Sequence, residues 1–301
     1  MFGVTILGNN SALPAYNRHP TSQIITLNDH LFLVDCGEGT QMQMNLYKIR
    51  RSRINHIFIS HLHGDHYFGL PGLITSYGLL GRLHELHLYA PAALLDILQL
   101  QLNVSDTKLP YDLHFHALEK NASLIVDEDN FSVEAFEVSH RIDCWGFLFR
   151  EKKKPRRINI EAVKKHNIPV DFFEHLKRGE DFIDGETIVP NEIVTTANKP
   201  AKSYGYGADT LYLESLAEKF RDVNMLYHEA TYLKDKAEKA KSRFHSTSEQ
   251  AAMLAKLANA KKLLIGHFSS TYETLDEFLH EAKEVFSNTQ LALEGQTYLV
   301  S

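Results

Sequence analysis

The most informative feature of the chain is a short segment rich in metal-binding side chains. It reads His61-Leu62-His63-Gly64-Asp65-His66 and directly follows the apolar run 57–59. Imidazole nitrogen and carboxylate oxygen suit Zn²⁺, which binds both without a geometric preference from its d-electrons. Gly64 permits a sharp turn, so that His61 and His63 can face one ion while Asp65 and His66 face another. The segment therefore predicts a metal site at the end of a strand rather than a solvated turn.

Three further candidate ligands follow strand-like runs elsewhere in the chain. His140 follows the run 131–139, Asp209 follows 204–208 and His267 follows 263–266. Two metal ions need more ligands than one short loop offers, and strand ends are the places we expect them to come from. A carboxylate such as that of Asp209 can place one oxygen on each of two cations.

Other residues of the same types need a separate interpretation, because the chain has 17 histidines and most must be structural. His228-Glu229 lacks the second His of the metalloprotease helix motif, since Tyr232 stands in its place. His228, Glu229 and His245 remain candidates for proton transfer or for support of the ligands, with a structural role equally open. The histidines assigned to strand surfaces and strand flanks are His84, His87, His114 and His116.

Composition places the chain among ordinary globular proteins. It has 301 residues, of which 44% are hydrophobic and 23% are charged. A net charge of -6 argues against binding nucleic acid through bulk positive charge, so a polyanionic partner needs a local basic patch. The two cysteines, Cys36 and Cys144, form neither a disulfide framework nor a Cys-x-x-Cys motif, which favours a reducing compartment. The start lacks the features of a signal peptide and no stretch reaches membrane-spanning length, so we expect a cytoplasmic protein.

Short β-rich runs alternate with helical patterns, which predicts an α/β sandwich. Helix starts are expected at two capping boxes, Ser246 with Glu249 and Thr274 with Glu277. The expected strands are 4–7, 23–27, 31–35, 56–60, 86–89, 113–117, 131–138, 145–150, 203–207, 225–228, 263–265 and 298–300. The expected helices are 41–49, 67–80, 92–102, 211–220, 247–259 and 275–286.

One segment, 151–199, breaks this rhythm. It holds weak helical pieces and turn signals, and we interpret it as an insertion within a single domain that spans residues 1–301. It opens on a basic run that would be a solvated loop in most proteins and that is also the first candidate for binding RNA. The residues of this run are Lys152, Lys153, Lys154, Arg156 and Arg157.

Taken together, these residues resemble the ribonuclease Z family, the tRNA 3′-processing endoribonucleases of the metallo-β-lactamase superfamily. The resemblance covers nearly the whole chain. The loop 61–66 specifies the superfamily alone, and its continuation Gly69-Leu70-Pro71-Gly72-Leu73 is narrower. The other segments that carry the resemblance are 8–20, 34–41, Ala208-Asp209-Thr210, His228-Glu229-Ala230-Thr231, Phe244-His245-Ser246-Thr247 and Gly266-His267-Phe268-Ser269.

The resemblance implies a four-layer αβ/βα sandwich, two Zn²⁺ ions per subunit or another divalent metal in their place, and a homodimer. It implies that His61, His63 and His140 hold one ion, that Asp65, His66 and His267 hold the other, and that Asp209 bridges them. Asp65 would also accept a proton from the attacking water. His245 would assist the leaving group, with Glu229 as its orienting partner.

The implied substrate is precursor tRNA, cleaved by metal-activated water to leave a tRNA 3′-hydroxyl and a 5′-phosphorylated trailer. Two departures concern the grip on tRNA: the stretch 168–180 has no Gly-Pro motif, and no Arg follows His267 within 268–272. Another hydrolase of the same scaffold, acting on a small phosphodiester, a sulfate ester or a thioester, is one alternative. A non-catalytic RNA-binding protein with a vestigial site is a second.

Overall fold

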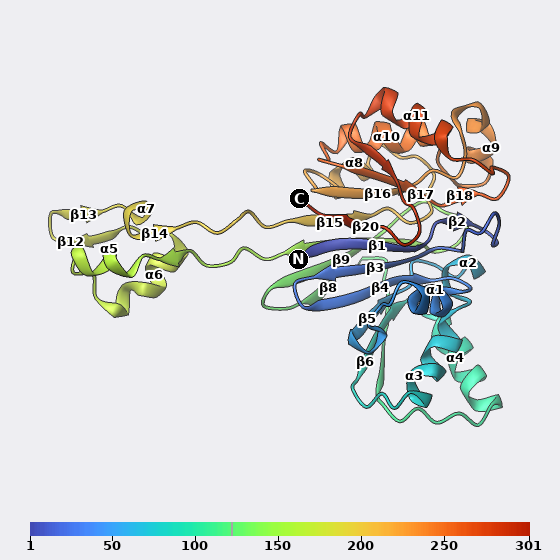
Figure 1. The fold of residues 1–301 in the computed structure, drawn as a ribbon, viewed down its shortest axis with the longest axis horizontal. Helices are drawn as coiled ribbons and strands as arrows, with labels where there is room; N and C mark the ends of the chain where they lie inside the picture. The colour runs from blue at the N-terminus through green and yellow to red at the C-terminus, as the bar shows by residue number, and fades with distance from the viewer. Residues whose placement is uncertain (122) are drawn as a thin grey trace. The chain divides into compact units, whose positions relative to one another are not determined.

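The computed structural model describes residues 1–121 and 123–301, and the chain divides into two compact units. The first unit comprises 1–127, 133–149 and 202–301, and the second comprises 128–132 and 150–201. The first unit contains two seven-stranded sheets packed face to face with helices on both outer sides, as Figure 1 shows. This is the four-layer α/β sandwich that the resemblance implies. Among the described residues, no helix combines the length and apolar character needed to cross a membrane.

The first sheet consists of strands from the first part of the chain and, at one edge, the last strand of the chain. Its parallel strands β4 to β7 end at the same edge, where the loop 59–63 emerges. Helices α1 (Thr40–Leu46), α3 (Leu70–Leu79) and α4 (Ala93–Val104) pack on its outer face. The strand order is β20 (Thr297–Leu299), β1 (Phe2–Gly8), β3 (Ser22–Leu27), β4 (His30–Cys36), β5 (Ile54–Phe58), β6 (Leu86–Ala90) and β7 (Leu113–Ala117).

The second sheet is built from the later part of the chain. Helices α8 (Leu216–Lys219), α10 (Ser248–Leu257) and α11 (Asp276–Val285) pack on its outer face. Its strands β15, β16, β17 and β19 pair in parallel, so their carboxyl ends also meet at one edge. The strand order is β19 (Thr289–Leu291), β17 (Leu263–Gly266), β16 (Met225–Glu229), β15 (Ser203–Tyr206), β10 (Trp145–Glu151), β9 (Phe131–Glu137) and β8 (Leu124–Asp127).

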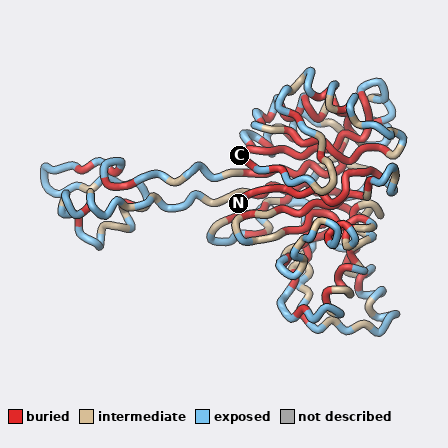
Figure 2. Tube along the Cα trace, in the orientation of Figure 1, coloured by how far each residue is buried: buried red, intermediate tan, exposed pale blue. Residues whose placement is uncertain are grey.

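Aromatic rings fill the space between the sheets. Phe32 and Phe58 of the first sheet lie 5.7 and 5.4 Å from the ring of Phe149 on β10, and Phe147 lies 5.4 Å from Phe58. All four side chains are fully buried, and Figure 2 shows that burial follows the strands of both sheets. Burying one such ring contributes about 1.5–3 kcal/mol, so this layer fixes the sheets against each other. The strand edges that carry the candidate ligands are thereby held together.

Several local predictions were wrong because tertiary contacts decided the backbone. The helix expected at 211–220 is reduced to α8, since the amides of Thr210 and Leu211 donate to the Glu229 carboxylate and to the Ser139 carbonyl. The capping box of α10 uses Thr247 with Gln250, while the Ser246 hydroxyl donates to the carbonyl of Thr210. Helix α11 begins without a side-chain cap, and strand β8 was not expected.

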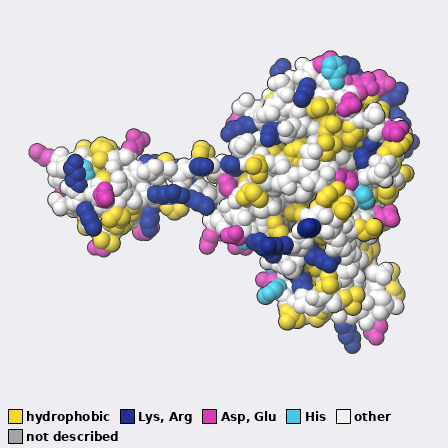
Figure 3. Space-filling model, viewed as in Figure 1, with side chains coloured by type: hydrophobic (Ala, Val, Ile, Leu, Met, Phe, Trp, Pro, Cys, Tyr) yellow, Lys and Arg dark blue, Asp and Glu magenta, His cyan; other side chains and the backbone are white. Residues whose placement is uncertain are grey.

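The second unit overlaps the predicted insertion and has a small core of its own. Val163, Leu176 and Val194 lie in this core. Lys and Arg side chains gather along the stretch that leads into the unit from β10, as Figure 3 shows. Its elements are β11 (Arg157–Ile158), α5 (Ile160–Lys165), a 3-10 turn (Val170–Phe172), α6 (Phe173–Arg178), β12 (Phe182–Asp184), β13 (Thr187–Val189), α7 (Asn191–Val194) and β14 (Thr195–Thr196).

Candidate metal centre

Every candidate ligand stands at or just after the carboxyl end of a strand. The loop 61–66 follows β5 and runs into the short helix α2 (Gly64–Tyr67), and His140 follows β9. Asp209 follows β15 and His267 follows β17. Ala208 and His267 adopt left-handed backbone conformations, with φ of 51° and 60°. Such conformations cost about 1–3 kcal/mol in non-glycine residues and persist where the surrounding structure imposes them, often at functional sites.

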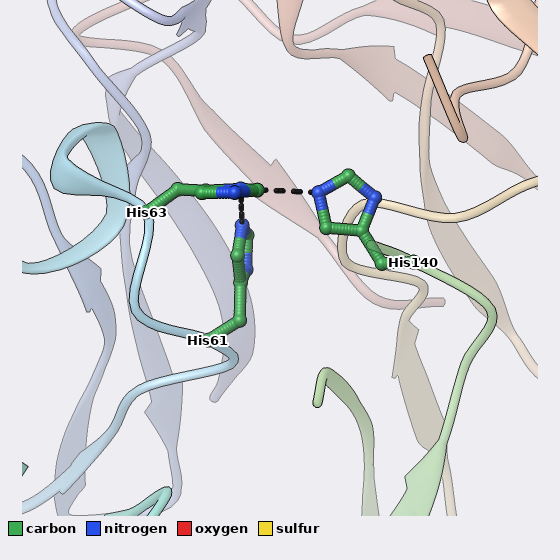
Figure 4. A group of neighbouring side chains, drawn as sticks. All are labelled: His61, His63 and His140. Carbon is green, nitrogen blue, oxygen red and sulfur yellow. Dashed lines mark hydrogen bonds between the residues drawn. The ribbon is translucent and has the colours of Figure 1, made fainter. Parts of the chain in front are cut away.

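Three imidazoles from two distant segments form the first cluster, drawn in Figure 4. The Nδ1 atom of His63 lies 3.0 Å from Nε2 of His61 and 3.1 Å from Nε2 of His140. His61 is fully buried, whereas His63 and His140 are half-buried. The three ring nitrogens therefore face a common point, as the ligands of a metal ion do.

Asp65, His66 and His267 form the second cluster. Nε2 of His66 lies 3.3 Å from Nε2 of His267, and Oδ2 of Asp65 lies 3.5 and 3.3 Å from these two nitrogens. The backbone amide of Ala12 donates to Oδ2 of Asp65 at 2.7 Å. Two imidazoles and one carboxylate form a donor set that suits a borderline-soft divalent cation.

Asp209 joins the two clusters. Its Oδ2 atom lies 3.3 and 3.2 Å from Nε2 of His66 and His267, and 3.7 Å from Nε2 of His61. The side chain is almost fully buried. One carboxylate thus faces the ring nitrogens of both clusters, which is the position of a bridging ligand.

Partners outside the clusters fix which ring nitrogen faces inward. Nδ1 of His140 lies 3.0 Å from the carbonyl oxygen of Phe244, which can only accept, so this nitrogen carries the proton. Nδ1 of His66 likewise donates to Asp35 at 2.8 Å, and Nδ1 of His267 lies 2.9 Å from the Thr231 hydroxyl. Each arrangement leaves Nε2 with a lone pair directed into the site, as metal-binding histidines require.

Burial controls the charge of the first cluster. It lowers the pKa of His61 well below the ordinary value, and neighbouring His66 lowers it further. Burial and the adjacent His140 lower the pKa of His63 to about 4, and burial also lowers the pKa of His140. These imidazoles are therefore neutral near pH 7, which is the form that binds a metal.

The carboxylates reverse this pattern in the second cluster. Burial favours neutral His66, but Asp209, Asp65 and Asp35 together raise the pKa of His66 well above the ordinary value. Burial opposes ionisation of Asp65 and Asp209, yet the surrounding histidines hold the pKa of both below the ordinary range. The buried negative charge of Asp35, Asp65 and Asp209 thus favours a cation at this position, whether a proton or a metal ion.

His245 and Glu229 form an ion pair beside the clusters. Nδ1 of His245 lies 2.9 Å from Oε1 of the fully buried Glu229, whose Oε2 accepts from the Thr231 hydroxyl at 2.5 Å. Burial favours the neutral imidazole, but Glu229 outweighs it and raises the pKa of His245 to about 9. His245 therefore carries a proton near pH 7. His228 takes no part in this ion pair, because its Nδ1 bonds the backbone carbonyl of Glu229 and its side chain is fully buried.

A cavity of about 310 Å³ opens onto the clusters. His63, Asp65, Asp209 and His245 line it, together with Ser11, Ala12, Gly64, Phe68 and Arg141. The clusters are thus accessible to a ligand, and the protonated His245 faces the same space.

The other predicted residues lie away from the clusters in sequence. The basic run 152–157 belongs to the second unit. His114 and His116 lie on β7 as predicted, whereas His87, predicted to flank a strand, lies within β6, where its ring stacks 5.0 Å from that of His114.

Three further residues support the ligands without being predicted to do so: Asp35, Ser60 and Thr231. Asp35 is fully buried and accepts four hydrogen bonds, from the Ser60 amide and hydroxyl, from His66 and from the Tyr206 hydroxyl. The signal for Asp35 was present, because a carboxylate interrupts the apolar strand β4. Thr231 carried no comparable signal.

Proteins of known structure share the fold of this chain. The metallo-β-lactamase-fold protein YhfI of Bacillus subtilis superposes with a TM-score of 0.70 at 21% identity, covering 99% of this chain and 98% of its own. The fold is therefore that of the metallo-β-lactamases. The short form of human tRNase Z superposes with a TM-score of 0.72 at 25% identity, covering 99% of both chains.

Residues 2–154 match the family model described as Anti-Pycsar protein Apyc1. Ribonuclease Z of Bacteroides thetaiotaomicron is 41% identical over 302 aligned positions, which cover 100% of this chain and 96% of the relative. Over its whole length the chain belongs to the ribonuclease Z family, and its first half also falls within the family that the Apyc1 model describes. The resemblance stated from the sequence motifs is thereby confirmed.

Removal of the Asp35 carboxylate tests the support of the second cluster. Asp35→Ala leaves four buried donor groups without their acceptor, and we expect it to lower the free energy of unfolding by about 3–5 kcal/mol. Ser60→Ala removes only one of the donors and should cost about 1 kcal/mol. Urea unfolding in excess chelator measures both without a contribution from metal binding. If Asp35→Ala fails to fold, Asp35→Asn provides the comparison, and a loss no larger than that of Ser60→Ala would contradict the assigned role.

Proposed function

We propose that the protein is a metal-dependent endoribonuclease that removes the 3′ trailer from precursor tRNA. The observation that carries the proposal is the pair of ligand clusters joined by Asp209 at the floor of an open cavity. Membership of the ribonuclease Z family supports the substrate class. The products would be a tRNA with a 3′-hydroxyl and a trailer with a 5′-phosphate.

The donor set fits two divalent metal ions, with Zn²⁺ as the expected metal. His61, His63 and His140 would hold one ion, Asp65, His66 and His267 would hold the other, and Asp209 would bind both. Two features favour metal binding here. The imidazoles of the first cluster are neutral. In the second cluster, carboxylates surround His66 and attract a cation. When bound, such ions lower the pKa of a water molecule to roughly 7 and neutralise charge on phosphate oxygens.

Two side chains, those of Asp65 and His245, transfer the protons of the reaction. Water adds to phosphorus, the bond from phosphorus to the upstream 3′ oxygen breaks, and Asp65 accepts the proton released by the water. His245 donates its proton to the departing 3′ oxygen, since its ion pair with Glu229 keeps the imidazole protonated and its side chain lines the cavity. Glu229 holds the ring in position and stabilises its charge.

The second unit is the proposed RNA-binding element. Lys153, Lys154 and Arg156 of the predicted basic run line a cavity of about 530 Å³ with Lys177 and Arg178. Lys177 and Arg178 are paired with Glu174 and Glu180, whereas Lys153 and Lys154 extend into solvent. Since the whole chain carries net negative charge, this local positive patch is the feature suited to phosphate groups. Lys152 and Arg157 complete the proposed contact set.

A homodimer and a cytoplasmic location complete the proposal. Large apolar side chains are exposed on α1 and on and after α3, with 72% of Met42, 65% of Leu46 and 89% of Leu79 accessible. An exposed apolar face of this kind suits a second copy of the chain, and light scattering in solution tests it. Both cysteines are buried free thiols, which suits a reducing compartment such as the cytoplasm.

Cleavage of an end-labelled precursor tRNA with a 3′ trailer is the decisive test. We expect one cut after the discriminator base, a 3′-hydroxyl on the tRNA and full activity on a substrate with a 2′-deoxy scissile nucleotide, because water is the nucleophile. Gel mapping to the nucleotide reads the result. Chelation should abolish cleavage and Zn²⁺ should restore it. Absence of a cut at the junction between tRNA and trailer would refute the proposal, and so would loss of all cleavage of the deoxy substrate.

The role of His245 is tested with leaving groups of different basicity. His245→Ala should reduce kcat on precursor tRNA by about 10²–10⁴-fold, since the ribose 3′ oxygen needs a proton to depart. With bis-p-nitrophenyl phosphate, whose leaving group departs as an anion, the same variant should lose at most a few-fold. Metal content measured in parallel is the control for an intact site. An equal loss on both substrates would exclude a role in protonating the leaving group.

The basic patch is tested through the salt dependence of binding. The triple variant Lys153→Ala, Lys154→Ala and Arg157→Ala keeps Arg156, whose Nε donates to Thr195. We expect weaker binding of precursor tRNA and a salt slope smaller by up to about 3, one for each lost phosphate contact. Fluorescence titration at several salt concentrations measures it. The charge-matched control replaces the exposed Lys256, Lys261 and Lys283 of the first unit, and equal slopes in the two triple variants would contradict the proposed patch.

A further inference from the structure

Two residues of the catalytic cavity have no part in the chemistry described above. Phe68 and Arg141 line the cavity together with His63, Asp65 and His245. Phenylalanine and arginine side chains do not bind metal ions, and neither residue is needed to transfer a proton. Both are nevertheless positioned next to the ligands, since Phe68 stands two residues after His66 and Arg141 directly follows His140. Both side chains are therefore placed to contact a ligand that enters the cavity.

Phe68 presents an open aromatic face. Its side chain is 63% exposed, although a phenylalanine ring is usually buried. The ring lies against the backbone of Gly64, where a Cβ atom would stand only 2.3 Å from Cε2 of Phe68. On another side it contacts Tyr67, with ring centroids 5.1 Å apart at 68°. Glycine at position 64 thus allows the ring to lie on the ligand loop, with the rest of its surface accessible.

Arg141 presents an uncompensated charge. The side chain is exposed, and within the described part of the chain it forms no ion pair with an aspartate or glutamate. It is near enough to His63 to act on that group, since burial, His140 and Arg141 all lower the pKa of His63. A guanidinium at the mouth of a cavity rich in carboxylates and histidines is suited to a phosphate group, which it binds through two parallel hydrogen bonds.

We propose that Phe68 and Arg141 determine which nucleotides occupy the cavity: Phe68 stacks on an unpaired base next to the scissile phosphate, and Arg141 binds a flanking phosphate. The proposal deepens the proposed function and rests on it. Aromatic rings and arginine are the side chains that proteins use to hold single-stranded RNA. A paired base keeps its neighbours on both faces and cannot stack on Phe68. The two residues therefore select an unpaired segment at the end of a stem.

A fluorescent base tests the stacking contact without cleavage. 2-Aminopurine is placed on either side of the scissile phosphate of a precursor RNA, and binding is followed with chelator-treated protein. Stacking on an aromatic ring quenches 2-aminopurine, so we expect quenching at one of the two positions. Phe68→Leu should remove at least half of it, and Phe68→Tyr should retain it. Quenching that is unchanged in Phe68→Leu at both positions would overturn the proposal.

Kinetics with abasic substrates provide the second readout. Phe68→Leu should reduce kcat/KM on precursor tRNA by roughly 10-fold, within the range measured for base stacking. An abasic site at the quenched position should reduce wild-type activity to a similar extent, and the two changes together should cost no more than either alone. Independent, multiplying effects at both flanking positions would contradict the contact. Leu124→Ala, another exposed apolar side chain that lies on β8, is the control and should leave both readouts unchanged.

Arg141 is tested by the same RNA. Arg141→Ala should raise KM about 10-fold with little change in kcat, and Arg141→Lys should recover part of the loss because it keeps the charge but not the paired hydrogen bonds. An unchanged KM in Arg141→Ala would remove this residue from the proposal. The outcomes are separable from the proposed function: if the wild-type protein does not cut the trailer, the function fails, whereas a wild-type enzyme with indifferent Phe68 and Arg141 variants refutes this inference alone.

Discussion

Asp209 brings one carboxylate oxygen within 3.2–3.7 Å of ring nitrogens from His61, His66 and His267. The charge balance of the whole site depends on this contact. A carboxylate so deeply buried loses its hydration and must be compensated by positive charge. His61 and His63 are kept neutral by burial and cannot supply that charge. The arrangement is therefore stable only with cations or protons between the histidines and the carboxylates. This requirement links the electrostatics of the fold to metal binding.

The supporting residues make the site specific as well as charged. Asp35, Thr231 and the Phe244 carbonyl accept the Nδ1 protons of His66, His267 and His140, so that each ring presents its Nε2 lone pair. Asp35 in turn is held by Tyr206 from the second sheet. A hydrogen bond from one sheet thus fixes a ligand attached to the other, and the packing of the two sheets and the geometry of the site depend on each other.

Much of the centre was predictable from the chain because its signals are local. The loop 61–66 places three histidines and an aspartate after an apolar strand, and His140, Asp209 and His267 each follow a run of strand-like residues. Parallel strands deliver their carboxyl ends to one edge, so such residues tend to converge. Predictions that depended on local propensity alone did less well. Thr210 and Leu211 looked helical, yet their amides bond to Glu229 and Ser139 instead.

The sequence by itself determined the residue types, the order of strands and ligands along the chain, and the family motifs. Only the tertiary structure decided which nitrogen of His66, His140 and His267 faces the site, that Glu229 is fully buried beside His245, and that Asp35 supports His66. These facts arise from contacts between residues far apart in sequence, such as Asp35 and Tyr206. No periodicity or spacing encodes such contacts, because they exist only once the two sheets have packed and water has been excluded from between them.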